Sequence, residues 1–259
     1  MLTENPVRCA AIVELERYGQ NVASAIGRLL DELSWEGNAR KYRGGGRGLE
    51  NVLTAEVFQA LDLLPRAAFL GAVLRAATTI APEDRSSVAL PNAIEHLEAA
   101  SVEVLLGDLV IPDLGIQAQP DVVIESESSY VFVEAKRVRG GSFPEEQLAR
   151  ELLLTATYGQ GRQPVLLLVV GGPPPLLVKG HGRVSVEDAI EVGLRSIEER
   201  IGFSVRDRLA GATVAFLTWA EISAHVEAAV ADYQNSDTST RQAVQRTAAT
   251  LVDAVATHS

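Results

Sequence analysis

Hydrophobic and polar positions divide the chain into a helical first part and a second part in which strands and helices alternate. Apolar residues recur at helical spacing over residues 8–33, 50–64 and 66–76, and a further short helix is predicted over 91–100. From residue 101 the apolar runs become short and Val-rich, with turn residues between them, which is typical of strands. The predicted strands cover residues 101–111, 119–125, 130–138, 164–172 and 212–219.

Helical spacing returns between and after these strands. Helices are predicted over 143–159, 185–202, 220–233 and 241–258, with Pro144 before the first and Ser185 as the N-cap of the second. The order of elements predicts an α/β fold with a mixed central sheet of about five strands, flanked by helices and extended by N- and C-terminal helices. We expect three segments, residues 1–48, 49–232 and 233–259, the second holding the core.

Composition narrows the class of protein. The chain has 259 residues, 47% of them hydrophobic and 22% charged, as in ordinary globular proteins. A single cysteine, Cys9, excludes an internal disulfide framework and a cysteine-based zinc finger. No secretory signal and no apolar run long enough for a membrane span is visible, so we expect a cytoplasmic protein.

The net charge of −11 argues against a protein coated in basic surface, but nucleic-acid binding needs only a local positive stripe. Residues 38–48 offer one candidate, since Arg40, Lys41, Arg43 and Arg47 lie there among glycines without an acid. The alternative interpretation of this segment is a glycine linker that its charges keep soluble.

Three charged residues interrupt the two Val-rich strands around residue 128. If their turn is centred on Glu127 and Ser128, residues whose numbers add to 255 face each other, and Asp121 then lies opposite Glu134. Directly opposed residues have Cβ atoms about 4.5–5.5 Å apart. Lys136 projects from the same face as Glu134, whereas Ala135 points to the other.

Two carboxylates this close repel each other unless a cation lies between them. Mg²⁺ prefers carboxylate and carbonyl oxygens, so Asp121, Glu134 and the backbone carbonyl of Ala135 predict a magnesium site, with Mn²⁺ as a substitute. An isolated Glu-x-Lys triplet is more often a solvated pair on a sheet. The strand context and the helix that follows favour the metal site.

These residues resemble the PD-(D/E)XK nuclease superfamily. Pro120-Asp121, twelve further residues and Glu134-Ala135-Lys136 match its motif, and the resemblance implies a restriction-endonuclease-like core of helix, three strands, helix and strand. It also implies a glutamate on the helix before the first strand. Glu50 and Glu56 both qualify, and the pattern Glu-Asn-x-Leu-Thr favours Glu50 as a metal ligand.

Some exonuclease-like branches carry a glutamine and a tyrosine four residues apart on the next helix. This chain has Gln147, but Glu151 stands at the tyrosine position, which favours an endonuclease. Gln147 is expected to orient the site or a phosphate, unless it is an ordinary surface residue. Gln147 and Glu151 share one helix face.

The resemblance implies a Mg²⁺-dependent hydrolase that cleaves phosphodiester bonds, with Lys136 orienting the attacking water. We expect DNA as the substrate, with RNA not excluded, restriction or antiviral defence as the setting, and a homodimer as the assembly. The alternative is a nuclease-like module that no longer cuts but binds nucleic acid or a partner protein.

Overall fold

The structure is a computed structural model that describes residues 47–80, 96–104, 107–136 and 142–258. Side chains of residues 47–49 and 258 lie outside that description. The predicted helix over 8–33 also lies outside it, as do Arg40, Lys41 and Arg43. Arg47 enters only as the first backbone position of a helix.

Helices and strands alternate from residue 101 onward, as the hydrophobic pattern predicts. The elements in chain order are α4 (Arg47–Leu63), α5 (Leu70–Ala76), β1 (Thr78–Ile80), η1 (Leu97–Ala99), β2 (Ser101–Val104), β3 (Leu109–Ile111), η2 (Pro112–Leu114), β4 (Ile116–Ala118), β5 (Val122–Glu125), β6 (Ser129–Ala135), α7 (Gln147–Tyr158), β7 (Gln163–Val170), β8 (Leu176–Val178), β9 (Gly182–Val184), α8 (Val186–Ile201), η3 (Arg206–Leu209), β10 (Thr213–Thr218), α9 (Trp219–Asp232) and α10 (Thr238–His258).

The central sheet is mixed and has six strands in the order β1-β10-β7-β6-β5-β2. β6, β7 and β10 run parallel to one another, whereas β5 is antiparallel to β6, β2 to β5 and β1 to β10. The mixed α/β class is thus confirmed. The sixth strand, β1, has three residues and is too short for hydrophobic alternation to reveal it.

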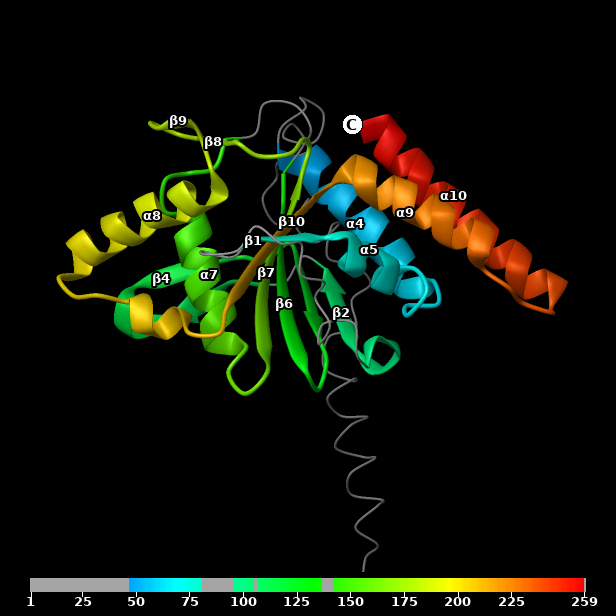
Figure 1. Cartoon of the computed structure of the whole chain (residues 1–259), viewed down its shortest axis with the longest axis horizontal. Coiled ribbons are helices and arrows are strands. Elements are labelled where there is room, and N and C mark those ends of the chain that lie inside the picture. Colours follow the sequence, from blue (N-terminus) through cyan, green and yellow to red (C-terminus); the bar gives the residue numbers. More distant parts are fainter. Residues whose placement is uncertain (1–46, 81–95, 105–106, 137–141, 259) are drawn as a thin grey trace, which may run out of the picture.

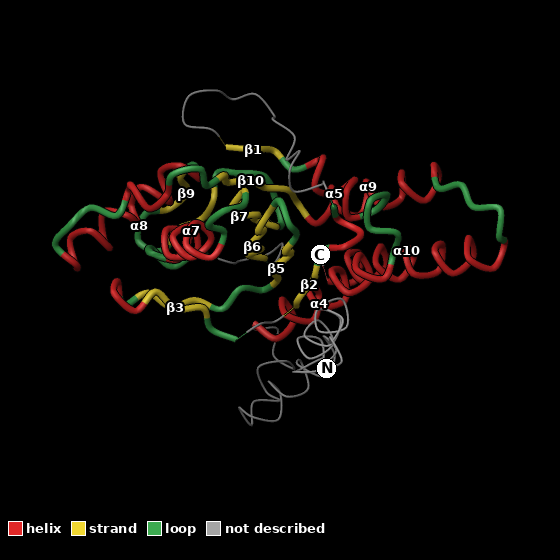
Figure 2. The backbone as a smooth tube through the Cα atoms, turned by 90° about the horizontal axis from the view of Figure 1, so that it is seen from below, coloured by secondary structure: helices red, strands yellow, loops and turns green. Residues whose placement is uncertain are grey.

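Helices cover both faces of this sheet. Figure 2 shows α7 and α8 on one side of the strands and α4, α5, α9 and α10 on the other. Alternation along β6 divides the core accordingly, because Val131 and Val133 belong to the apolar cluster under α4, whereas Phe132 belongs to the cluster under α7. α10 packs on α4 and α9, and its Leu251 is fully buried.

Several predicted boundaries are wrong; α10, for example, begins at Thr238 rather than at residue 241. The single strand over 101–111 is two strands, because Gly107 and Asp108 lie at a break after which β3 leaves the central sheet and pairs with β4. The helix expected from residue 66 starts only at Leu70, since the carbonyl of Pro65 accepts bonds from the amides of Ala68 and Phe69 in a turn. Of residues 91–100, the described part holds only the short 3₁₀ helix η1.

Candidate active site

The hairpin of β5 and β6 has the register that brings Asp121 and Glu134 together. Val122 pairs with Val133, and Glu125 pairs with Tyr130, so facing residues add to 255. Ser126 and Ser129 close the turn through a backbone bond of 3.0 Å. Asp121 lies one residue before β5, and its amide donates to the carbonyl of Val133 at 3.2 Å. The predicted register is confirmed.

Asp121 also holds the end of β6. Its Oδ2 accepts a hydrogen bond of 2.7 Å from the amide of Ala135. Burial, and after it the charge of Glu134, raise the pKa of Asp121 well above its usual value, while Lys136 acts against them. Asp121 therefore lies against the backbone of β6, the strand that carries Glu134.

Lys136 joins the strands to the first helix. Its Nζ donates to Oε1 of Glu134 at 2.5 Å and to Oε1 of Glu50 at 3.3 Å. Burial lowers the pKa of Lys136, but the negative charges of Glu134, Glu50 and Asp121 outweigh burial and leave the pKa raised. The amine is consequently a permanent cation at neutral pH.

Glu50, rather than Glu56, is the helix carboxylate of this site. Its side chain is 14% exposed and paired with Lys136, whereas Glu56 lies on the exposed side of α4. The two acids are six residues apart, and 3.6 residues per helical turn place them on different faces. Of the two candidates, Glu50 is thus the one that lies beside Lys136, and its role as a metal ligand stays a prediction.

Gln147 extends the network to α7. Its Nε2 lies 2.5 Å from Oε1 of Glu134 and 2.7 Å from Oε1 of Glu151. The shared face of Gln147 and Glu151 is confirmed, and Gln147 is a partly buried member of the site. Glu134 receives bonds from both Lys136 and Gln147 on one oxygen, which fixes its carboxylate.

Glu151 belongs to the site although the sequence predicts no role for it. It is 1% exposed, and its Oε2 has no hydrogen-bond partner among the described residues. Burial raises its pKa well above the usual value, as does the nearby Glu134. The signal in the sequence is an acid between Leu148 and Leu152, on the face of α7 that points into the core.

The other side of the site is held by backbone bonds. The amide of Lys136 donates to the carbonyl of Val169 on β7 at 2.7 Å, and the carbonyl of Lys136 accepts from Nε1 of Trp219 at 3.0 Å. The ring of Phe143 lies 5.5 Å from the amine of Lys136. Trp219 is 1% exposed, so a buried aromatic residue also anchors the site.

The carboxylate and carbonyl oxygens of this site are suitable ligands for a hard divalent cation. Burial raises the pKa of Glu134 as it does those of Asp121 and Glu151, so all three carboxyl groups are costly to ionise. The positive charge of Lys136 lowers the pKa of each of them. Asp121, Glu134, Glu50 and the carbonyl of Ala135 are oxygen ligands of the kind that Mg²⁺ prefers. The predicted ligand set therefore fits such an ion in type.

The side chains are not arranged as a metal site in this structure. Across the described ranges, no group of three or more His, Cys, Asp or Glu side chains surrounds a common point in the manner of ion ligands. The ammonium of Lys136 lies where the carboxylates of Glu134 and Glu50 converge, and it supplies the positive charge there. The cation thus stays a prediction.

Comparisons with known proteins add no assignment. No family model, no curated protein and no solved structure matches the chain. Within the described part of the chain, none of the helices has the length and apolar character needed to cross a membrane.

Proposed function

We propose that the protein is a metal-dependent nuclease of the PD-(D/E)XK type that hydrolyses phosphodiester bonds in DNA. The observation that carries the proposal is the buried cluster in which Lys136 contacts Glu134 and Glu50 while Asp121 caps the same strand. With α5, β1 and the β3–β4 hairpin left aside, the order α4, β2, β5, β6, α7 and β7 is the helix, three strands, helix and strand that the motif implies.

A divalent cation would be held by Asp121, Glu134 and the carbonyl of Ala135, with Glu50 assisting. When bound, it would polarise a phosphate and favour ionisation of a nearby water. In the hydrolysis, water oxygen bonds to phosphorus, the bond to the leaving oxygen breaks, and one proton of the water ends on that oxygen.

The residues of the chain would orient this reaction. The ammonium of Lys136 donates hydrogen bonds and offsets charge that develops on the phosphate oxygens. Gln147 fixes the carboxylate of Glu134 through its bond of 2.5 Å, which keeps the ligand in place as the amine turns to substrate. Glu151 at the tyrosine position favours an endonuclease, with restriction or antiviral defence in the cytoplasm as the setting and a homodimer as the assembly.

The test compares the wild type with Asp121→Asn, Lys136→Ala and a control, Asp253→Asn, on the exposed face of α10. Each variant is incubated with plasmid and linear DNA in Mg²⁺ or Mn²⁺. Loss of one electrostatic group in an active site costs about 10²–10³ in rate. We therefore expect the two site variants to cut at least ~100-fold more slowly, with the control unchanged.

Equal cleavage by all four proteins would show that the site is misassigned or that a contaminant cuts. A second candidate is a nuclease-like module that only binds nucleic acid, and the pairing of Glu134 and Glu50 by the amine of Lys136 favours it. This candidate would be established if the protein bound DNA but did not cut it, and if calorimetry found no Mg²⁺ binding that depends on Asp121 and Glu134.

A further inference from the structure

The hairpin of β8 and β9 presents basic side chains on one face. Its register pairs Leu177 with Arg183 and Val178 with Gly182, so Lys179 stands opposite His181 across the tip. Side chains alternate along each strand, which places Leu177 and Arg183 on the same outer face, and Lys179 and His181 lie in the turn between them. Leu176 and Val178 face the core and are 5% and 2% exposed.

Lys179 and Arg183 belong to the basic residues for which the described part of the chain offers no acidic partner. Neither forms an ion pair with any residue that the structure describes, whereas six of the described arginines do. The guanidinium of Arg183 donates to the carbonyl of Pro175 at 3.1 Å, which aims it along the hairpin. Both side chains are exposed, and Leu176–Val184 contains no acid.

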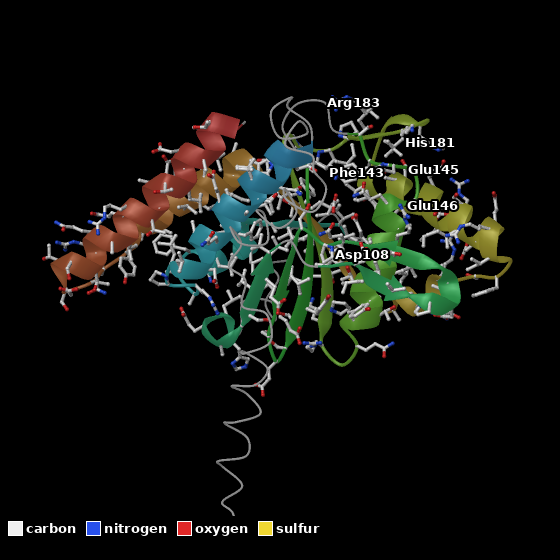
Figure 3. All side chains as sticks on the ribbon, turned by 180° about the vertical axis from the view of Figure 1, so that it is seen from behind. Asp108, Phe143, Glu145, Glu146, His181 and Arg183 are labelled. Carbon is white, nitrogen blue, oxygen red and sulfur yellow. The ribbon has the colours of Figure 1, made fainter. Side chains whose placement is uncertain are left out.

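Acids lie near the hairpin, but within the described residues no ion pair links them to Lys179 or Arg183. Glu145 lies 3.6 Å from Nε2 of His181, and Glu187 and Asp188 begin α8 after β9 ends. Figure 3 shows His181 and Arg183 at one edge of the molecule, with Glu145 below His181. Lys179 and Arg183 thus keep two uncompensated charges, which suits a ligand that carries regularly spaced negative charges.

Glycines open the tip to such a ligand. Gly180 and Gly182 have φ of +87° and +75°, in the left-handed region, and a Cβ on either would meet no atom within 4 Å. The tip therefore consists of Lys179 and His181 with Gly180 between them and Gly182 after them. Glycine at such positions allows a polymer backbone to approach the protein backbone closely.

The hairpin is tied to the candidate active site. The amide of Phe143 donates to the carbonyl of Leu177 at 2.8 Å, and the amide of Lys179 donates to the carbonyl of Phe143 at 2.9 Å. The ring of Phe143 in turn lies beside the amine of Lys136. In Figure 1, β8 lies at the same edge of the molecule as the first turn of α4. The hairpin is thus bonded to Phe143, whose ring lies beside Lys136 of the candidate site.

We propose that the outer face of β8 and β9 binds the phosphate backbone of DNA next to the scissile position, with Lys179 and Arg183 each contacting a phosphate. The proposal rests on the proposed nuclease function and adds the element that holds its substrate. Contacts to phosphates position the duplex without reading its sequence, so binding through this hairpin should be independent of sequence.

The experiment measures binding of a fluorescent DNA duplex by anisotropy, without divalent ions, at several NaCl concentrations. Lys179→Ala with Arg183→Ala is compared with the wild type and with Arg241→Ala plus Arg246→Ala, which removes two exposed charges from α10. Each phosphate contact contributes about 0.9 to the slope of log K against log salt. We expect the hairpin variant to lose roughly tenfold or more in affinity and about two units of slope, with the control unchanged.

A second variant changes both residues but keeps their positive charges. Lys179→Arg with Arg183→Lys should bind within about threefold of the wild type, because phosphate contacts depend mainly on charge. If the wild type cuts DNA but the alanine variant binds with wild-type affinity and slope, the hairpin assignment is wrong and the nuclease proposal stands. If the wild type neither binds nor cuts DNA, both proposals are wrong.

Discussion

At the scale of single residues, the candidate site depends on one carboxylate oxygen. Oε1 of Glu134 accepts from both Lys136 and Gln147, and Gln147 in turn donates to Glu151. Two buried carboxylates this close repel each other, which favours the neutral form of one of them. We infer that Glu151 is the neutral one, because burial and the charge of Glu134 raise its pKa well above the usual value, whereas Lys136 bonds directly to Glu134.

This assignment predicts how substitutions of Glu151 act. Glu151→Gln should change the free energy of unfolding by less than about 0.5 kcal/mol, because an amide imitates a protonated carboxyl group. Glu151→Ala should cost about 1–3 kcal/mol, since it leaves the amide of Gln147 short of a buried acceptor. Urea unfolding at neutral pH measures both. An equal loss in the two variants would mean that Glu151 is charged in the folded protein.

At the scale of elements, the site depends on how closely α7 and α8 pack. A Cβ at Gly193 of α8 would lie 2.8 Å from Cβ of Ala149 and 2.8 Å from the carbonyl oxygen of Glu145. The glycine thus allows a close contact with α7, the helix that carries Gln147 and Glu151. Any added atom at position 193 pushes that helix away.

Gly193→Ala should destabilise the fold by about 1–3 kcal/mol, the usual cost of adding atoms to a packed core. It should also slow DNA cleavage, because Gln147 would lose its position against Glu134. Gly172→Ala is the control, since a Cβ there would meet no atom within 4 Å. Thermal unfolding and a plasmid-cleavage assay serve as readouts. Wild-type stability and cleavage by Gly193→Ala would show that the close packing of α7 on α8 is not needed for the site.

The elements show why some features follow from the sequence and others do not. The register of β5 and β6 depends on a local turn, and the N-cap at Ser185 accepts from the amide of Asp188 as predicted, so short-range pattern is sufficient. β1 is recognisable as a strand only through its pairing with β10. Likewise, Glu151 and Gly193 acquire their roles from residues on other elements, which no spacing along one helix reveals.

At the scale of the whole molecule, the central sheet separates two apolar clusters. The acids of the candidate site, Asp121, Glu134 and Glu151, lie near the end of β6. Burial raises the pKa of Asp121, Glu134 and Glu151. The folded protein thus keeps protons that the unfolded chain releases above its ordinary carboxyl values of about 4. The contribution of these three acids to stability is therefore fully present below their ordinary pKa values of about 4 and is lost as pH rises through the raised values.

The slope of this decline is a prediction. Each proton held only by the folded state changes the free energy of unfolding by about 1.4 kcal/mol per pH unit. Asp121→Asn with Glu151→Gln should flatten the decline that begins above the ordinary carboxyl pKa of about 4, since neither new side chain titrates. Urea unfolding at increasing pH measures the slope. Identical slopes in the wild type and the double variant would show that these two acids do not titrate abnormally.

The bond from Trp219 to the carbonyl of Lys136 provides the protein with an internal optical probe. An indole is fluorescent, and its emission depends on the hydrogen bond that its N–H group makes. The sequence holds one other tryptophan, Trp35, so Trp35→Phe isolates the signal of Trp219. Movement of the Lys136 peptide when an ion or a nucleic acid arrives is then visible without any attached label.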